Sequence, residues 1–130
     1  MKGYLWAHIS GCEAAGFDEG ISGPKRLVTA ASQSNEKGYE LSPELRNSVF
    51  TNLLVDKGLL KKQADFNKDG KVSIQEAFRL AAERAPQLTA DESNGPQHPY
   101  MAGGDGSEWF LTRAATPSAA QTAKRCLICL

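Results

Sequence analysis

Residues 3–9 form a run that is apolar on both of its alternating faces and therefore constrains the fold more than any other segment. A half-exposed antiparallel strand alternates polar and apolar residues, whereas a strand buried on both sides of a parallel sheet does not. We therefore expect a parallel strand over Gly3 to Ile9. A second short strand is predicted over Lys25 to Ser32, after a Gly-Pro break that follows the Gly-rich loop 16–24.

Two later segments have the periodicity of amphipathic helices. The first is predicted to be capped by Ser42, to hold Pro43 in its first turn and to run to Gly58. Its apolar residues recur at helical spacing: Leu45, Val49, Phe50, Leu53 and Leu54. The second apolar stripe begins at Ile74 and is predicted to be stopped by Pro86.

The rest of the chain is predicted to be mostly loop. Residues 87–106 are rich in Gly, Asn and Pro, and one more strand is expected over residues 107–112. Residues 114–130 lack a periodic apolar face, so we expect a disordered tail after a folded unit of residues 1–113. Two helices with few strands indicate the α/β class, with a parallel-rich sheet that is only part of a larger one.

Length and charge exclude several classes of protein. A chain of 130 residues with 41% hydrophobic content can bury one core, and fifteen acids balance fifteen bases, so neither nucleic acid nor an anionic membrane is an expected partner. No transmembrane segment or signal peptide is apparent, which predicts a soluble protein. Three cysteines do not determine the compartment, and a secreted parent with an upstream signal stays open.

Cys12 follows the first predicted strand and is the candidate nucleophile. Functional groups gather at the carboxyl edge of parallel sheets, and small residues after Cys12 would let a substrate backbone approach. A thiolate there can attack a carbonyl if a base assists it and backbone N–H groups hold the oxyanion. A single cysteine after a strand is, however, more often a small buried hydrophobe.

Neither histidine is an obvious base for Cys12. His8 lies four residues earlier, which at about 3.3 Å per residue separates the Cα atoms by roughly 13 Å, so a place on the sheet face is expected. His98 lies in a Gln-His-Pro loop that would have to fold back toward Cys12. An exposed loop histidine without a catalytic task is the commoner case.

A twelve-residue acidic loop between the two predicted helices matches the EF-hand calcium pattern. Calcium takes six to eight oxygen ligands, and Gly70 allows the sharp turn that wraps the ion. The predicted ligands are the side chains of Asp65, Asn67, Asp69, Ser73 and Glu76 and the carbonyl of Lys71. Ser73 and Glu76 also match a helix capping box, which would not by itself require Asp65 or Asn67.

These segments together resemble the carboxyl-terminal half of a caspase-like or legumain-like cysteine peptidase domain, of the type that carries a calcium loop. The matching segments are Ser10-Gly11-Cys12-Glu13-Ala14-Ala15-Gly16 within residues 6–17, then residues 26–32, 39–40, 47–51, 65–76, 97–99 and 103–111. The resemblance implies a partial three-layer caspase-like fold with an EF-hand-like helix-loop-helix, a peptide or protein substrate, Cys12 as nucleophile, and a substrate pocket lined by residues 32–39.

The departure from that family concerns the base. The family's catalytic histidine ends an earlier strand, several tens of residues before the nucleophile, and only eleven residues precede Cys12 here. We therefore expect the chain to be inactive alone, with a missing amino-terminal half-domain as its partner or with catalysis lost.

Three hypotheses follow from the sequence. The first is a cysteine peptidase half-domain, and the second is a calcium-binding module without catalysis. The third is a redox or zinc role for Cys126 and Cys129, whose spacing fits but which have no further ligands nearby.

Overall fold

The computed structural model describes residues 3–40 and 47–111. These residues form a mixed α/β structure with strands β1 (Leu5–Ile9), β2 (Arg26–Ala30) and β3 (Tyr100–Gly103) in one sheet of order β1-β2-β3. β1 pairs with β2 in parallel, with His8 opposite Thr29, whereas β3 runs antiparallel to β2. The prediction that the first strand is parallel is therefore confirmed, but its expected burial on both faces is wrong, because β1 is the first strand in the order and each of its residues is exposed or only partly buried.

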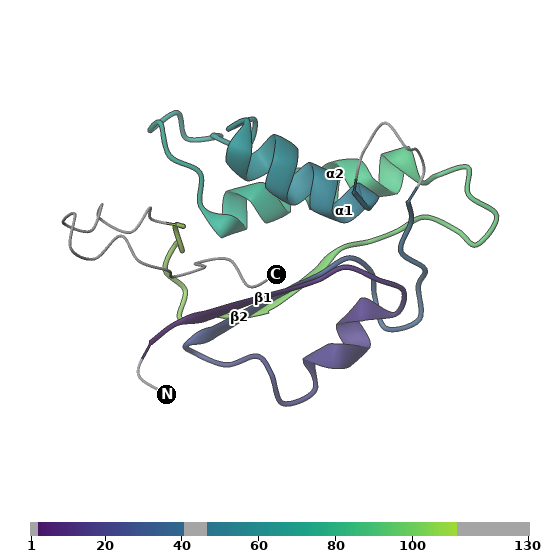
Figure 1. The fold of residues 1–130 in the computed structure, drawn as a ribbon, viewed down its shortest axis with the longest axis horizontal. Coiled ribbons are helices and arrows are strands. Elements are labelled where there is room, and N and C mark those ends of the chain that lie inside the picture. Colours follow the sequence, from purple (N-terminus) through teal and green to yellow (C-terminus); the bar gives the residue numbers. More distant parts are fainter. Residues whose placement is uncertain (1–2, 41–46, 112–130) are drawn as a thin grey trace, which may run out of the picture.

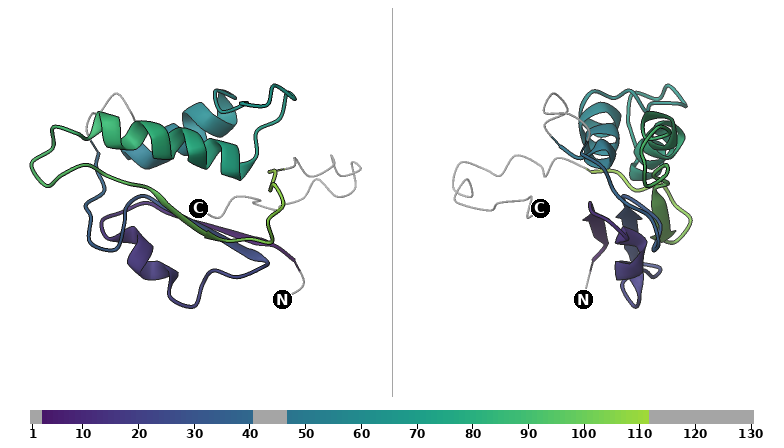
Figure 2. Two further views of the ribbon diagram at one scale, coloured as in Figure 1. Left: turned by 180° about the vertical axis from the view of Figure 1, so that it is seen from behind. Right: turned by 90° about the vertical axis from the view of Figure 1, so that its right-hand side faces the viewer.

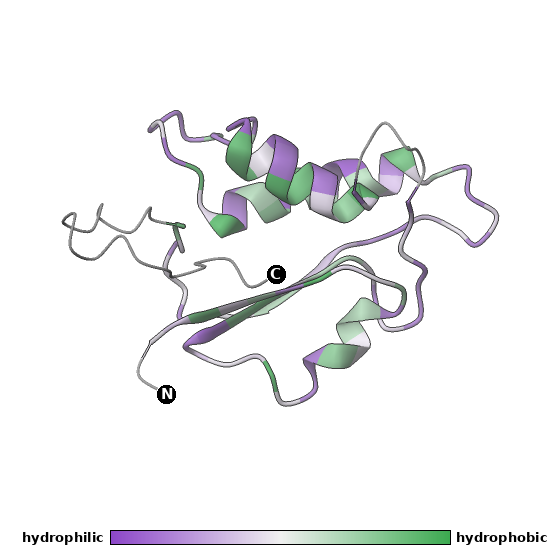
Figure 3. Cartoon of the chain, viewed as in Figure 1, coloured by the Kyte–Doolittle hydropathy of each residue, from purple (hydrophilic) through white to green (hydrophobic). Residues whose placement is uncertain are grey.

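The helices lie over one face of this sheet (Figure 1). They are α1 (Val49–Thr51), which continues directly into the π-helix η3 (Asn52–Leu60), and α2 (Ile74–Leu88). A short 3₁₀ helix, η1 (Ala14–Asp18), lies on the opposite side of the sheet, as two further views show (Figure 2). Hydrophilic residues predominate in the loop that joins η3 to α2 (Figure 3).

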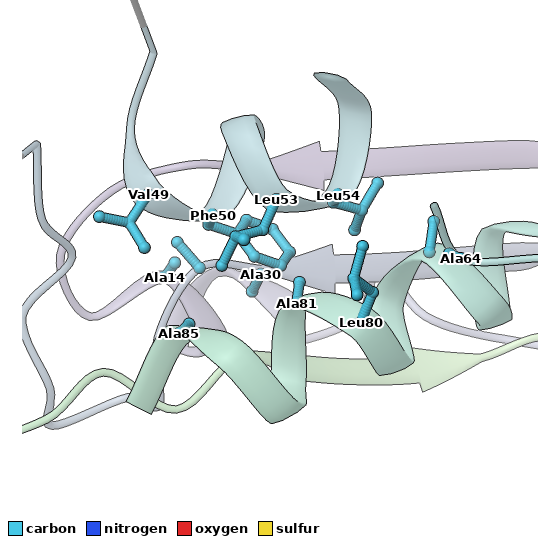
Figure 4. Packing of buried hydrophobic residues seen from close by; sticks show 12 residues of the cluster. Ala14, Ala30, Val49, Phe50, Leu53, Leu54, Ala64, Leu80, Ala81 and Ala85 are labelled. Atoms are coloured by element: carbon cyan, nitrogen blue, oxygen red, sulfur yellow. The ribbon is translucent and has the colours of Figure 1, made fainter. Parts of the chain in front are cut away.

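The main core lies where the helices meet each other and the sheet (Figure 4). Its buried residues are Ala14, Ala30, Ala31, Val49, Phe50, Leu53, Leu54, Ala64, Ala77, Leu80, Ala81 and Ala85. Gly58 lets η3 approach α2 closely, since a Cβ there would lie 3.0 Å from the Cβ of Ala77. A second cluster joins Leu27, Ile74 and Trp109. Burying a large apolar side chain contributes about 1.5–3 kcal/mol, so residues such as Phe50, Leu53 and Leu54 stabilise the fold substantially.

The first helix begins later than predicted. Ser42 and Pro43 lie outside the described residues, but Ser48 is not helical and its side chain accepts the N–H of Thr51 as the cap of α1. Ser48 is thus the cap, because its hydroxyl reaches a free amide of the first turn. The helix then ends at Leu60, two residues beyond Gly58.

Pro86 does not stop α2, which runs to Leu88. Proline removes one hydrogen bond, but the last turn is still closed by the N–H of Thr89, which donates to Ala85 O over 3.1 Å. The helix begins as predicted, with a capping box between Ser73 and Glu76.

The predicted last strand is wrong in position. Residues 107–111 form no strand, and β3 lies within the segment expected to be loop. Trp109 instead packs into the second core cluster, and its N–H and C=O bond to Gln75 and Ile74 of α2. The N–H and C=O of Trp109, which strand pairing would need, are therefore hydrogen-bonded to the start of α2 instead. No helix in the described ranges is long and apolar enough to cross a membrane.

Candidate functional site

Cys12 lies three residues beyond the end of β1, at the carboxyl edge that β1 and β2 share. It is exposed, and its Sγ lies 3.8 Å from the carbonyl oxygen of Gly38. The backbone N–H of Cys12 has no hydrogen-bond partner within the described part of the chain. An exposed thiol beside a free backbone donor is an arrangement that could hold the oxyanion of a carbonyl attacked at Cys12.

The turn that contains Cys12 is held by the residue that follows β2. Ser32 is fully buried; its hydroxyl donates to Gly11 O over 3.1 Å and accepts the N–H of Ala14 over 3.2 Å. Its carbonyl accepts the N–H of Ala15 over 2.9 Å. One side chain therefore bonds the backbone on both sides of Cys12. Nothing in the sequence signalled this role, because Ser32 and Cys12 are brought together only by strand pairing.

The loop after β2 packs directly against the same turn. A Cβ built on Gly38 would lie 2.5 Å from the carbonyl oxygen of Gly11, so only glycine allows this approach. Glu13 is tied to the loop as well, since its N–H donates to Glu36 O over 2.7 Å and its carboxylate pairs with Lys37 over 3.2 Å. The segment 32–39, which the family resemblance implies as the lining of a substrate pocket, contacts this turn through Ser32 and Gly38.

Gln97 fixes the far end of this loop and was not anticipated from the sequence. It is fully buried, its Oε1 accepts the N–H of Tyr39 over 3.1 Å, and its Nε2 donates to Ala31 O over 2.7 Å. Tyr39 in turn donates its hydroxyl to Gly95 O. Burial, followed by the charges of Glu92 and Cys12, raises the pKa of Tyr39, which therefore stays a neutral hydrogen-bond donor here.

His98 contacts Glu36 rather than Cys12. Its Nδ1 lies 2.7 Å from Glu36 Oε1, and its backbone N–H donates to Glu36 Oε2 over 2.9 Å. Burial acts to raise the pKa of Glu36, but the hydrogen bonds from His98 and Gln33 outweigh it and lower that pKa. Among the described residues no hydrogen bond joins His98 to Cys12. Since β2 and its loop lie between them, the structure does not bring these two residues together as a dyad.

His8 lies on the sheet face that the helices cover, as its spacing from Cys12 predicted. Its ring stacks on Phe50 with centroids 4.8 Å apart, and its nitrogens lie 3.3 Å from Thr29 Oγ1 and 3.0 Å from Thr51 Oγ1. Burial lowers the pKa of His8 from 6.5 to about 4. The imidazole is therefore neutral at pH 7 and lies partly buried between the sheet and α1.

In the acidic loop, side-chain oxygens accept hydrogen bonds from backbone N–H groups of the same loop. Asp65 accepts the N–H of Asp69 over 3.1 Å and of Gly70 over 3.0 Å, while Asn67 Oδ1 accepts the same Asp69 N–H over 3.0 Å. Asp69 accepts the N–H of Lys71 over 2.8 Å. Gly70 has φ +81°, which lets the chain turn sharply around the three side chains. Three of the predicted ligands therefore converge on one short turn.

Lys71, whose carbonyl is a predicted ligand, lies in the loop, whereas Ser73 and Glu76 lie at the start of α2. The buried Glu76 accepts the N–H of Ser73 over 3.0 Å and its hydroxyl over 3.2 Å, and Ser73 Oγ also reaches Glu108 Oε1 at 3.3 Å. In the described ranges, no three His, Cys, Asp or Glu side chains are grouped as they would be around a metal ion. The oxygen-only donor set fits calcium chemically, but Glu76 would have to leave its capping role to join Asp65 and Asp69.

The carboxyl-terminal end of the acidic loop, where α2 begins, is hydrogen-bonded to the segment after β3. Ile74 N–H donates to Trp109 O over 2.8 Å, and Gln75 Nε2 donates to Ser107 O over 3.0 Å. Arg79 of α2 lies over the ring of Phe66 at 4.5 Å from its centroid. The loop is thus joined to both the second core cluster and α2, so an ion bound in it would brace them.

The predicted pair Cys126 and Cys129 and the predicted tail over residues 114–130 lie outside the described residues. Comparison with known proteins gave no match to a protein-family model, to a curated protein or to a solved structure.

Proposed function

We propose that this chain is the nucleophile-bearing half of a caspase-like or legumain-like cysteine peptidase domain, with Cys12 as nucleophile and calcium in the loop Asp65 to Glu76. The observation that carries the proposal is the turn of Cys12: an exposed thiol and a free N–H at the carboxyl edge of two parallel strands. Its backbone is held on both sides by the hydroxyl of Ser32. Such a fixed turn is what nucleophilic attack requires, because the thiolate and the oxyanion donor must keep their geometry.

The base must come from elsewhere, because His8 and His98 both have other partners. The edge of β1, which pairs with no further strand among the described residues, is the place at which another segment would supply the base. Leu5 N–H donates to Lys25 O and Ile9 O accepts the N–H of Ala31, so the odd-numbered residues of β1 face β2. The backbone groups of the even-numbered residues then face away from β2, ready to pair with a further strand.

In the proposed reaction the Cys12 thiolate attacks the carbonyl carbon of a peptide bond. The sulfur–carbon bond forms, the amine leaves with a proton supplied by the base, and the thioester is then hydrolysed by water. The chain described here supplies the nucleophile and one oxyanion donor. We expect no peptide cleavage by this chain alone.

Chemical rescue tests this proposal. Purified chain is incubated with a peptidyl ester in the presence and absence of imidazole as an external base, and the acylated residue is located by mass spectrometry. We expect imidazole-dependent acylation of Cys12 that is absent in Cys12→Ala and unchanged in Cys126→Ser. Equal imidazole-dependent turnover by the Cys12→Ala variant would contradict the role of the thiol.

A second candidate function is a calcium-binding module without catalysis. The convergence of Asp65, Asn67 and Asp69 on one turn with Gly70 favours it, since a cap for α2 requires only Ser73 and Glu76. When bound, calcium would neutralise the clustered carboxylates and brace η3 against α2. Isothermal titration with calcium, with magnesium as control, measures this directly; acylation of Cys12 in the rescue experiment would decide between the two functions.

A further inference from the structure

The buried His8 joins three elements of the fold. Its ring lies between β1, β2 and α1, where it stacks almost parallel on Phe50, with 11° between the planes. Thr29 of β2 and Thr51 of α1 hold its two nitrogens. On the side that faces α1, the imidazole therefore has one hydrogen-bonding contact, the hydroxyl of Thr51.

A chain of hydroxyl groups continues from Thr51 to the surface. Ser48 Oγ donates to Thr51 Oγ1 over 3.1 Å, and Ser48 is also hydrogen-bonded to the hydroxyl of Ser10. Ser10 is exposed and lies two residues before Cys12. The contacts between Ser10, Ser48, Thr51 and His8 thus connect the turn of Cys12 to a partly buried titratable group.

Within the described part of the chain, no charged group contacts His8 that could compensate a proton on its ring. The groups that face it are Trp6 from β1, Thr29 from β2, and Phe50 and Thr51 from α1. None of these carries charge, and the positive end of the helix dipole at the start of α1 also opposes an imidazolium there. His8 is only partly buried, so a charged ring can gain hydration by moving away from Thr51 toward solvent.

We propose that protonation of His8 releases the turn that carries Cys12 through the hydroxyl chain of Thr51, Ser48 and Ser10. A neutral imidazole can accept a hydrogen bond from Thr51, whereas an imidazolium can only donate. As the charged ring moves toward water it gives up its contact with Thr51, and the contacts of Thr51 with Ser48 and of Ser48 with Ser10 lose their partner at the His8 end. As regulation of Cys12 this rests on the proposed function, but the release itself involves no catalysis.

The size of the effect follows from the proton linkage. Burial lowers the pKa of His8 from 6.5 to about 4, so in the opened state His8 binds a proton more readily than in the closed state. With these two values, the ratio of open to closed turn rises about 30-fold between neutral pH and about pH 5. The closed turn is favoured again above about pH 6.5.

Amide hydrogen exchange tests the release without a peptidase assay. The probes are the N–H groups of Ala14 and Ala15, which donate to Ser32 in the closed turn. We expect their protection, corrected for intrinsic exchange, to fall about 30-fold from about pH 7.5 to about pH 5. The amides of Asp69 and Gly70 in the acidic loop serve as internal reference.

Three variants test whether the fall in protection depends on His8, on His98 and on the hydroxyl chain. His98→Gln should keep the fall in protection and His8→Gln should abolish it, since the chain contains only these two histidines. Ser10→Ala cuts the hydroxyl chain at its exposed end and should make the protection of Ala14 independent of pH, even if His8→Gln does not fold. A full pH response in Ser10→Ala, or its loss in His98→Gln, would overturn the proposal.

Discussion

Gly38 and Gly11 face each other across the contact between the loop after β2 and the turn of Cys12, but only one of them has room for a side chain. In Gly38→Ala the new Cβ would lie 2.5 Å from Gly11 O and 2.9 Å from Gly11 C. Ordinary contacts begin at 3.4 Å, so the two backbones must separate by about 0.9 Å. Both neighbouring atoms belong to the backbone, which cannot yield as a flexible side chain would.

We expect Gly38→Ala to lose about 1–3 kcal/mol of unfolding free energy, the usual cost of overpacking. For a chain of this length that is a fall in Tm of about 4 °C per kcal/mol. The matched control is Gly11→Ala, since a Cβ on Gly11 meets nothing within 4 Å and should change stability by less than about 0.5 kcal/mol.

Urea unfolding of the two variants measures the difference, and exchange of the Glu13 amide locates it. The Glu13 N–H donates to Glu36 O in the same loop, so its protection should fall at least about tenfold in Gly38→Ala and stay unchanged in Gly11→Ala. If the two variants are equally stable, the reasoning that the two backbones are in fixed contact is refuted.

Three further predictions concern other parts of the fold. The pKa of His8 is lower in the folded than in the unfolded chain, so its contribution to stability is complete above about pH 6.5 and is lost as the pH falls toward about 4. Urea unfolding across that range should show a loss of about 3 kcal/mol in unfolding free energy. The variant His8→Gln should not show this loss. With a dissociation constant of about 10⁻⁴ M, about 5 mM calcium should add roughly 2 kcal/mol, and thermal unfolding should show that Asp65→Ala abolishes this gain while Asp91→Ala keeps it. Gly103→Ala should prevent folding or cost more than about 3 kcal/mol in urea unfolding, because the new Cβ would lie 2.0 Å from Arg26 O at φ +85°; Gly106→Ala has the same φ and open space, so it should cost only about 1 kcal/mol.

Elements whose signals are local could be predicted from the amino-acid sequence. The parallel strand ending at Ile9, the strand over residues 26–30 and the helix that starts after Ser73 were all predicted, because continuous apolar runs and a capping box act over a few residues. The convergence of Asp65, Asn67 and Asp69 is local too, since Gly70 and backbone N–H groups within the loop produce it.

The remaining features depend on contacts between residues that are distant in the sequence. The last strand was misplaced because pairing with β2 selected the weak segment 100–103, while Trp109 was buried against α2 instead. The bonds of Ser32 to both sides of Cys12, and the partners of His8 and His98, join residues far apart in sequence. Such contacts depend on strand register and helix packing, which a short-range pattern does not encode.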